Sequence, residues 1–327
     1  MDKLIAQFST QIKEAIEIGK SVELENNSTI QNVLACGLGG SGIGAKISKL
    51  IFNAEINVPF DSINDYHIPG FVNQNTLVIA TSYSGNTEET LAALVECKKR
   101  GATIVTITSG GKLLDEAKAN NWPHFILPGG EQPRAMLAYG LVQQMFVLKA
   151  FGLIKSDFVK DLEETIELID QNETAIKSEA DTLATALFNK RPVIYSDPIF
   201  EGVAVRFRQQ INENSKMLSW NAVLPEMNHN ELVGWAGGDD NIAVIKLTSN
   251  FEFYRTSKRW EFCKSRISEI TPNVFEIKAK GNSILVEALY LIHLTDWVTY
   301  NLAVLKQIDP VEVNVITSLK SELSKLK

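Results

Sequence analysis

Short apolar runs alternate with segments of helical periodicity along this chain, and that alternation is the strongest constraint on its fold. The apolar runs of the first half, which read as buried strands, lie at 33–36, 75–81, 102–108 and, more briefly, 125–127. Segments with apolar residues at helical spacing cover 1–19, 45–52, 87–100, 112–120 and 135–151. Strands that alternate with helices favour a parallel sheet covered by helices on both faces. We therefore expect a doubly wound α/β fold.

The second half repeats this order of elements. Its expected strands lie at 191–196, 241–247 and 273–278, and its expected helices at 201–212, 254–267 and 283–305. The offset between matching helices is 166 residues, from Cys97 to Cys263, and between matching strands 160, from Val33 to Val193. Near-constant offsets indicate an internal duplication. We expect one domain at 1–152 and another at 153–327, with a helix at 156–185 joining or bracing them.

Charge and cysteine content exclude several classes of partner. The net charge is −7 and there is no basic block, which argues against a nucleic-acid partner because that would require a positive face. No apolar stretch is long enough to cross a bilayer, and the N-terminus lacks signal-peptide features, so we expect a cytoplasmic protein with no membrane partner. The three cysteines lie far apart without metal-ligand spacing, and we expect reduced, mostly buried thiols and no bound metal.

A hydroxyl-rich loop, SYSGNT at 82–87, follows the second expected strand and precedes a helix. The N-terminus of a helix presents free N–H groups and a partial positive charge, and Ser82, Ser84 and Thr87 add donors there. The loop has no lysine, so it is not a P-loop, and we interpret it as a cradle for a single phosphate. The matching turns of the second half carry Asp197 and Glu252, which make poor anion cradles, so we expect the phosphate in the first half.

The glycine segment GLGGSG at 37–42 matches G-x-G-x-x-G after a strand, and Asp61 lies 19 residues after Gly42. This arrangement is compatible with a dinucleotide site, in which the acid would bind a ribose. The hydroxyl-rich loop argues against that reading, because a nicotinamide enzyme would not need it. A third reading is that the glycines only permit tight packing of a strand against a helix.

Three further residues are candidates for catalysis. Arg134 follows Pro133 in the expected first turn of the helix at 135–151, where a cation could meet a developing oxyanion, although it could instead be a surface residue paired with Glu131. Glu213 lies in an amide-rich run at a helix C-terminus, where the helix dipole disfavours a negative charge. A carboxylate whose charged form is disfavoured is suited to act as a general base. His229 is flanked by asparagines and acids, but a lone histidine is often structural or solvent-exposed.

Five segments in this order resemble a known family: GLGGSG, SYSGNTEET, GEQPR, NENSK and PEMNHNE. Together they resemble the bifunctional phosphoglucose/phosphomannose isomerases, which are built from two sugar-isomerase (SIS) domains of flavodoxin-like fold. The resemblance spans about 33–320. SYSGNTEET alone would indicate only some SIS domain, and the two segments of the second half make the match more specific.

The resemblance implies a role for each candidate residue. Arg134 would stabilise an enediolate, and Glu213 would move the proton between C2 and C1. His229 would help to open the sugar ring, reaching the site from the partner subunit of a homodimer. A C-terminal lysine would assist, for which Lys320 is favoured over Lys306, although Gln307 and Ile308 depart from the family's usual tail. The residues implied for binding the sugar phosphate are Gly40, Ser41, Ser82, Ser84 and Thr87.

The implied reaction is the interconversion of glucose 6-phosphate, and of mannose 6-phosphate, with fructose 6-phosphate through a cis-enediol. An aldose–ketose isomerisation of this kind needs no redox cofactor and no metal. The alternative is a non-catalytic sugar-phosphate-binding protein, because SIS domains also serve as ligand-binding modules. No helix-turn-helix segment or basic arm is evident in the sequence, which weighs against that alternative.

Overall fold

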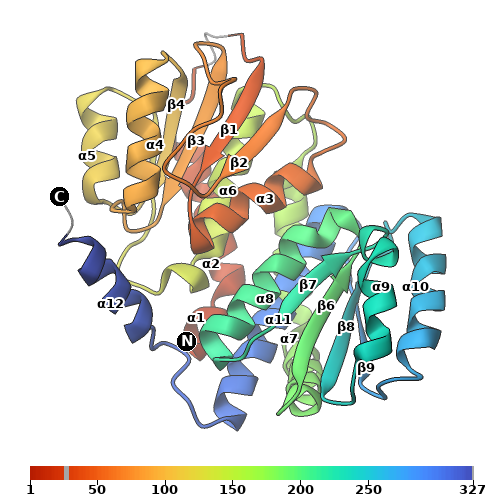
Figure 1. Ribbon diagram of the computed structural model, residues 1–327. Helices are drawn as coiled ribbons and strands as arrows, with labels where there is room; N and C mark the ends of the chain where they lie inside the picture. The colour runs from red at the N-terminus through yellow and green to blue at the C-terminus, as the bar shows by residue number, and fades with distance from the viewer. Residues whose placement is uncertain (26–28, 326–327) are drawn as a thin grey trace.

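The computed structural model describes residues 1–25 and 29–325, which form two α/β lobes (Figure 1). The N-terminal lobe contains a five-stranded sheet in the order β2-β1-β3-β4-β5, with every neighbouring pair parallel. Its strands are β1 (Asn32–Cys36), β2 (Phe60–Ile63), β3 (Thr76–Ser82), β4 (Thr103–Thr108) and β5 (His124–Ile126). Its helices are α1 (Asp2–Ala6), α2 (Phe8–Ser21), α3 (Gly39–Ile51), α4 (Glu88–Lys99), α5 (Gly111–Ala119) and α6 (Leu137–Ala150), with the 3₁₀ turn η1 (Pro133–Ala135) before α6.

The C-terminal lobe contains a four-stranded parallel sheet in the order β7-β6-β8-β9. Its strands are β6 (Arg191–Ser196), β7 (Trp220–Val223), β8 (Ile242–Thr248) and β9 (Val274–Lys278). Its helices are α7 (Phe158–Leu187), α8 (Glu201–Ser215), α9 (Glu231–Gly234), α10 (Tyr254–Ile267) and α11 (Ile284–Leu305), with 3₁₀ turns η2 (Pro198–Phe200), η3 (Glu226–His229) and η4 (Trp235–Gly237). The last helix, α12 (Asn314–Leu323), lies beside α4 and α5 of the other lobe (Figure 1).

Alternate residues of each strand serve two different cores. Leu77 of β3 joins α2, α3 and α6 in a core that continues through both lobes, whereas the next residue, Val78, packs with Leu94 of α4. Successive side chains of a strand point to opposite faces of the sheet, and both faces here are covered by helices. In the second lobe, Ile194 joins the shared core while Tyr195 packs under α10. The shared core therefore lies between the two sheets and holds the lobes together.

The two sheets have the same topology, as the duplication predicts. β7, β6, β8 and β9 follow the order of β2, β1, β3 and β4, and the second sheet has no counterpart of β5 in the described residues. The order 2-1-3-4-5 is the flavodoxin-like one, and differs from the 3-2-1-4-5-6 order of dinucleotide-binding folds. The expected α/β class with two doubly wound parallel sheets is thus confirmed, and the dinucleotide reading of Gly37 to Gly42 and Asp61 loses its support.

Three features differ from the sequence-based expectations. The edge strands β2 and β7 were not predicted, because each is short and only partly buried, so its sequence lacks an apolar run. The glycine segment predicted as a loop is helical from Gly39, because tertiary contacts outweigh the weak helix propensity of glycine. The expected helix at 1–19 is interrupted at Gln7, between α1 and α2. No helix within the described residues is long and apolar enough to span a membrane.

Candidate active site

The hydroxyl-rich loop connects the end of β3 to the start of α4. Ser82 is buried, and its Oγ lies 2.8 Å from Oγ1 of Thr87, so the two hydroxyls close the loop across its base. Ser84 is exposed at the tip. Gly85 has a φ of +69°, and a Cβ at this position would lie 1.7 Å from the carbonyl oxygen of Gly110, so no side chain fits there. The loop is therefore held in one shape, with hydroxyls at the N-terminus of α4.

The first turn of α3 lies against this loop and against η1. The Oγ of Ser41 accepts a hydrogen bond of 3.0 Å from the backbone N–H of Tyr83. A Cβ on Gly40 would lie 3.2 Å from the carbonyl oxygen of Pro133 and 3.3 Å from Cα of Arg134. The absence of a side chain at Gly40 lets the helix approach the Arg134 backbone closely. The structure thus brings the N-termini of α3 and α4 and the Arg134 segment together.

Arg134 is buried between the two lobes, with only 6% of its surface exposed. Its Nε donates to Oδ1 of Asn214 at 2.8 Å, and its Nη2 donates to the carbonyl oxygens of Pro310 at 2.5 Å and Val311 at 3.1 Å. Its Nη1 lies 3.5 Å from Oε2 of Glu213. Burial lowers the pKa of the Arg134 guanidinium, while the carboxylate of Glu213 opposes that shift. The alternative, a surface Arg134 paired with Glu131, is not what the described contacts give.

Glu213 lies in the last turn of α8, with its side chain 34% exposed. Lys216 ends this helix in the left-handed conformation, at a φ of +48°. Its Nζ donates at 2.8 Å to the carbonyl oxygens of Glu213, Asp309 and Glu312. Arg134 and Lys216 therefore both bind the segment that leads into α12, and both contact Glu213, one at its carboxylate and the other at its backbone carbonyl.

A buried network behind Arg134 was not predicted from the sequence. Nη2 of Arg206 donates to the carbonyl oxygen of Arg134 at 3.0 Å and to Oδ2 of Asp296 at 2.5 Å. Gln210 donates to the other oxygen of Asp296 at 3.1 Å. The Nδ2 of Asn214 donates to Thr299 at 2.9 Å, which orients the amide oxygen that binds Arg134. The only sequence signal was a cluster of polar residues on α8, a helix otherwise buried in the shared core.

The two candidate lysines lie in different surroundings. Lys320 of α12 lines a cavity of about 1030 Å³ together with Ser84 and Thr87 of the hydroxyl-rich loop. Lys306 follows the end of α11, and its Nζ donates to the carbonyl oxygen of Lys216 at 3.3 Å. Of the two, Lys320 is the one that shares a cavity with residues predicted to bind phosphate.

His229 is not brought to the other candidate residues within this chain. It is exposed at the end of η3, on the opposite side of the C-terminal sheet from the shared core, as Met227 of the same turn packs with Tyr195. In the described part of the chain it forms no hydrogen bond or ion pair with Arg134, Glu213 or Lys320. A role in catalysis at this chain's own site therefore has no geometric support.

The matching loop of the second lobe is already occupied by a carboxylate of the protein. Glu287 of α11 is fully buried and accepts hydrogen bonds from the hydroxyl of Ser249 and from the backbone N–H of Asn250, the latter at 3.1 Å. Glu252 of this loop forms a 2.6 Å ion pair with the buried Lys246. The hydroxyl of Ser249 and the N–H of Asn250 are therefore already bonded within the protein, whereas Ser84 of the first loop is exposed. Residues 1–25 and 29–325 contain no group of three or more His, Cys, Asp or Glu side chains that could hold a metal ion.

Comparisons with known proteins agree with this arrangement. Residues 29–154 match the SIS domain family, and residues 176–323 match the family described as the bacterial phospho-glucose isomerase C-terminal SIS domain. The bifunctional phosphoglucose/phosphomannose isomerase of Aquifex aeolicus is 36% identical over 90% of this chain and 91% of its own length. The enzyme of the same name from Caldicellulosiruptor bescii is 36% identical over the full length of both chains.

A solved structure gives the same fold at much lower identity. The C-terminal domain of glucosamine-fructose-6-phosphate aminotransferase from Francisella tularensis aligns with a TM-score of 0.76 and 14% identity, over 96% of this chain and 97% of that one. At this identity the likeness concerns the fold alone. It agrees with the two-lobed arrangement of parallel sheets described above.

Proposed function

The chain belongs to the bifunctional phosphoglucose/phosphomannose isomerase family, and from this premise we propose that it interconverts glucose 6-phosphate and mannose 6-phosphate with fructose 6-phosphate. The observation that carries the proposal is the contact between Arg134 and Glu213 beside the N-terminus of α3. A carboxylate and a buried guanidinium at one site are what an enediol mechanism requires. The carboxylate moves the proton, and the cation stabilises the enediolate oxygen.

The proposed binding mode follows from the loops. Ser82, Ser84 and Thr87, with Gly40 and Ser41 at the start of α3, would hold the 6-phosphate through hydroxyl and backbone N–H donors. The phosphate is remote from the reacting carbons, so its binding energy can position C1 and C2 against Glu213. Lys320, on the opposite wall of the cavity, would add a positive charge.

In the proposed mechanism, an acid and a base first open the sugar ring. Glu213 then removes the proton from C2 of the aldose and returns it to C1 of the enediol, on one face of the substrate. Arg134 stabilises the negative charge that develops on the enediolate oxygen, and its bonds to Asn214 and to the 310–311 carbonyls hold it in place without reorganisation. A base that approaches a planar enediol can serve both epimeric aldoses.

Replacing Glu213 by Gln tests this proposal. We expect the turnover of Glu213→Gln to fall by about 10²–10⁴-fold, the usual contribution of a general base, with the affinity for fructose 6-phosphate nearly unchanged. Coupled assays with glucose 6-phosphate and with mannose 6-phosphate measure turnover, and exchange of the C1 proton of fructose 6-phosphate into deuterated water measures the proton transfer. The exposed Glu261→Gln is the matched control. If the unmodified protein binds fructose 6-phosphate without exchange, the non-catalytic alternative gains support.

A homodimer in which His229 of one subunit serves the site of the other is a second part of the proposal. It is supported by the exposed position of His229, away from Glu213 of its own chain. Mixing inactive Glu213→Gln and His229→Ala chains should then restore part of the activity, because one site of each heterodimer would hold both intact residues. Exchange of subunits is verified with differently tagged chains. No recovery after proven exchange would contradict the shared site.

The domain boundary at 152/153 and a cytoplasmic location also remain proposals. The boundary is supported by the position of 153–157 between the last helix of the first lobe and α7. The location is supported by the three cysteines, which are free and buried, as expected in a reducing compartment. Neither point affects the chemistry proposed for Arg134 and Glu213.

A further inference from the structure

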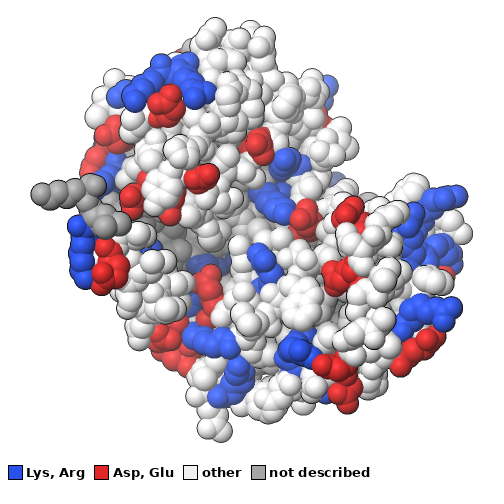
Figure 2. Space-filling model, viewed as in Figure 1, with Lys and Arg blue, Asp and Glu red and all other residues white. Residues whose placement is uncertain are grey.

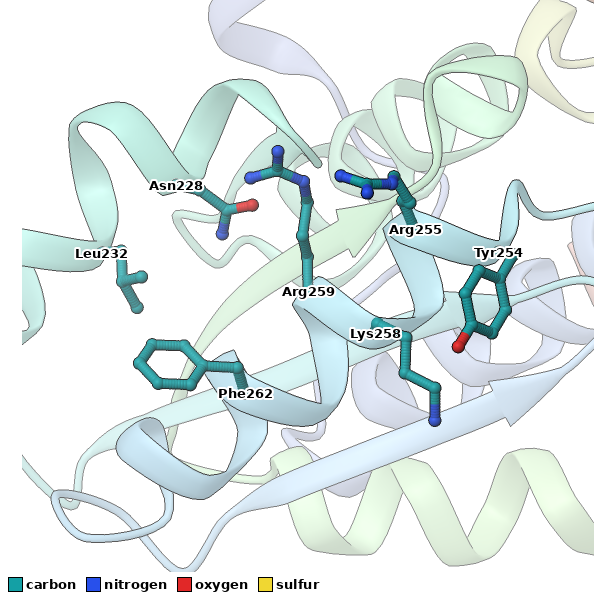
Figure 3. Close-up of a pocket in the computed structure, with 7 residues that line it drawn as sticks. All are labelled: Asn228, Leu232, Tyr254, Arg255, Lys258, Arg259 and Phe262. Carbon is teal, nitrogen blue, oxygen red and sulfur yellow. The ribbon is translucent and has the colours of Figure 1, made fainter.

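A second pocket lies in the C-terminal lobe, and Arg134, Glu213 and Lys320 are not among the residues that line it. It occupies about 570 Å³ between η3, α9 and one side of α10. It is lined by Asn228, Leu232, Tyr254, Arg255, Lys258, Arg259 and Phe262 (Figure 3). None of these residues belongs to the hydroxyl-rich loop, to the Arg134 network or to the cavity that contains Lys320.

Two arginines of this pocket have no anionic partner. Arg255 and Arg259 are one helical turn apart on α10, and both line the pocket (Figure 3). Neither forms a hydrogen bond or an ion pair with any residue of the described ranges. Like charges four residues apart destabilise a helix, and Arg255 stands in the first turn of α10, where the helix dipole also disfavours a cation. An anion from outside the chain would relieve both costs.

The other basic residues of α10 differ in this respect. Lys258 is paired with Glu261 at 2.7 Å, Lys264 with Glu276 at 2.8 Å and Arg266 with Glu269 at 3.0 Å. Figure 2 shows Lys and Arg side chains gathered over the α10 end of a protein whose net charge is −7. The unpaired charge is therefore local to Arg255 and Arg259.

The equivalent turn of the first lobe has the opposite charge. At the offset of 166 residues, Tyr254 and Arg255 correspond to Glu88 and Glu89, which begin α4. Acidic residues are the stabilising choice for the first turn of a helix. In the second lobe, a basic residue, Arg255, takes the place of the acidic Glu89 in the first turn of the helix that lines the pocket.

The far end of the pocket is apolar. Phe262 lies one turn beyond Arg259 on the same side of α10, with 55% of its surface exposed, and it faces Leu232 of α9 (Figure 3). The buried Oδ1 of Asn228 has no hydrogen-bond partner and lies on the side toward Arg259. A volume of this size is in the range of small-molecule sites, which commonly combine an apolar lining with a few polar groups.

We propose that this pocket binds an organic phosphate that carries a flat apolar group, such as a nucleoside 5′-phosphate. The phosphate would bind the guanidinium groups of Arg255 and Arg259, which suit a phosphate because each presents several N–H donors in one plane. The base would lie between Phe262 and Leu232. This pocket shares no lining residue with the site proposed for the hexose 6-phosphate, although Asn228 is next to His229 in the sequence.

Calorimetric titration with adenosine 5′-monophosphate tests the proposal, with saturating fructose 6-phosphate present to block the catalytic site. We expect one molecule bound per chain, and binding at least about tenfold weaker in Arg255→Gln and in Arg259→Gln, since each removes a charge-assisted hydrogen bond. Lys264→Gln, on the same helix but paired with Glu276 and outside the pocket, should bind as the unmodified protein does. Inorganic phosphate and adenosine, titrated separately, should each bind more weakly than the nucleotide.

Three results would overturn the proposal. The first is no saturable binding of adenosine 5′-monophosphate to the unmodified protein. The second is binding that is equal in Arg255→Gln, Arg259→Gln and the control. The third is a change in the oligomeric state of the double variant Arg255→Gln/Arg259→Gln, measured by light scattering, when the unmodified protein binds no nucleotide. That result would assign the two arginines to a subunit interface.

Discussion

Nη1 of Arg134 lies 3.5 Å from Oε2 of Glu213, although the two residues come from different lobes of the protein. Arg134 belongs to η1, before the last helix of the first lobe, and Glu213 to the end of the first long helix of the second lobe after α7. The proposed cation and the proposed base therefore meet only when the lobes are packed together. Catalysis should depend on the contact between the lobes as much as on the two side chains.

Replacing Arg134 by Gln should lower kcat by about 10²–10³-fold, the usual effect of removing one oxyanion donor. Arg134→Lys keeps the charge but loses the planar set of donors, so its kcat should lie between that of the unmodified protein and that of Arg134→Gln. Arg134→Gln also removes the hydrogen bonds to the carbonyl oxygens of Pro310 and Val311, so a protease should cleave the segment before α12 faster in this variant. Steady-state kinetics and limited proteolysis measure these effects. A kcat within about threefold of the original would rule out the proposed role.

Replacing Ser84 by Ala should weaken substrate binding more than it slows the reaction. Ser84 is exposed at the loop tip and lines the cavity, so its hydroxyl can bind a phosphate without breaking the Ser82–Thr87 contact. We expect KM for fructose 6-phosphate to rise about tenfold, the usual effect of losing a hydrogen bond to a charged group, with little change in kcat. Ser257→Ala, a change of the same size in the other lobe, serves as control. An unchanged KM would contradict the phosphate cradle.

The two C-terminal lysines should differ in their effects. Lys320→Met removes a charge from the cavity that contains Ser84 and Thr87, and we expect kcat/KM to fall at least about tenfold because a charge-assisted contact with substrate is lost. Lys306→Met removes one hydrogen bond to the carbonyl of Lys216 and should change kcat/KM by less than about threefold. The opposite ranking would transfer the proposed role to Lys306.

The Arg206–Asp296 pair should be important for stability. Both side chains are buried, with exposed fractions of 3% and 8%, so removing one partner leaves an uncompensated charge. We expect Arg206→Met to lower the free energy of unfolding by about 3–5 kcal/mol, measured by urea denaturation. The double variant Arg206→Met/Asp296→Leu should be more stable than Arg206→Met, because it leaves no unpaired carboxylate at position 296. If the double variant were less stable than Arg206→Met, the Arg206–Asp296 pair would stabilise the fold by more than the neutralisation of each other's charge.

Much of the fold was predictable because its signals are local. Buried strands such as β3 and β8 contain a run of four apolar residues, and α10 was predicted with its observed ends. The edge strands were missed because β2 and β7 are only partly buried, and so their residues need not be apolar. The start of α3 was misplaced because Gly40 lies in close contact with the distant backbone of Pro133 and Arg134, which local helix propensity does not register.

The candidate site was predictable only in part. The hydroxyl-rich loop is a contiguous segment, so its place after β3 and before α4 follows from the chain order. Arg206 and Asp296, by contrast, are 90 residues apart, and no spacing rule relates them. Glu287 filling the second loop was equally hidden, because it comes from a helix 37 residues further along the chain.

The amino-acid sequence by itself determined the alternation of strands and helices, their duplication, and the residue types able to bind a phosphate and move a proton. The tertiary structure alone decided that Arg134 lies against Glu213, that Lys320 rather than Lys306 lines the cavity beside Ser84, and that His229 stands apart. The physical reason is the range of the interactions. Hydrophobic periodicity acts over a few residues, whereas the position of each polar group depends on how two lobes pack around one shared core.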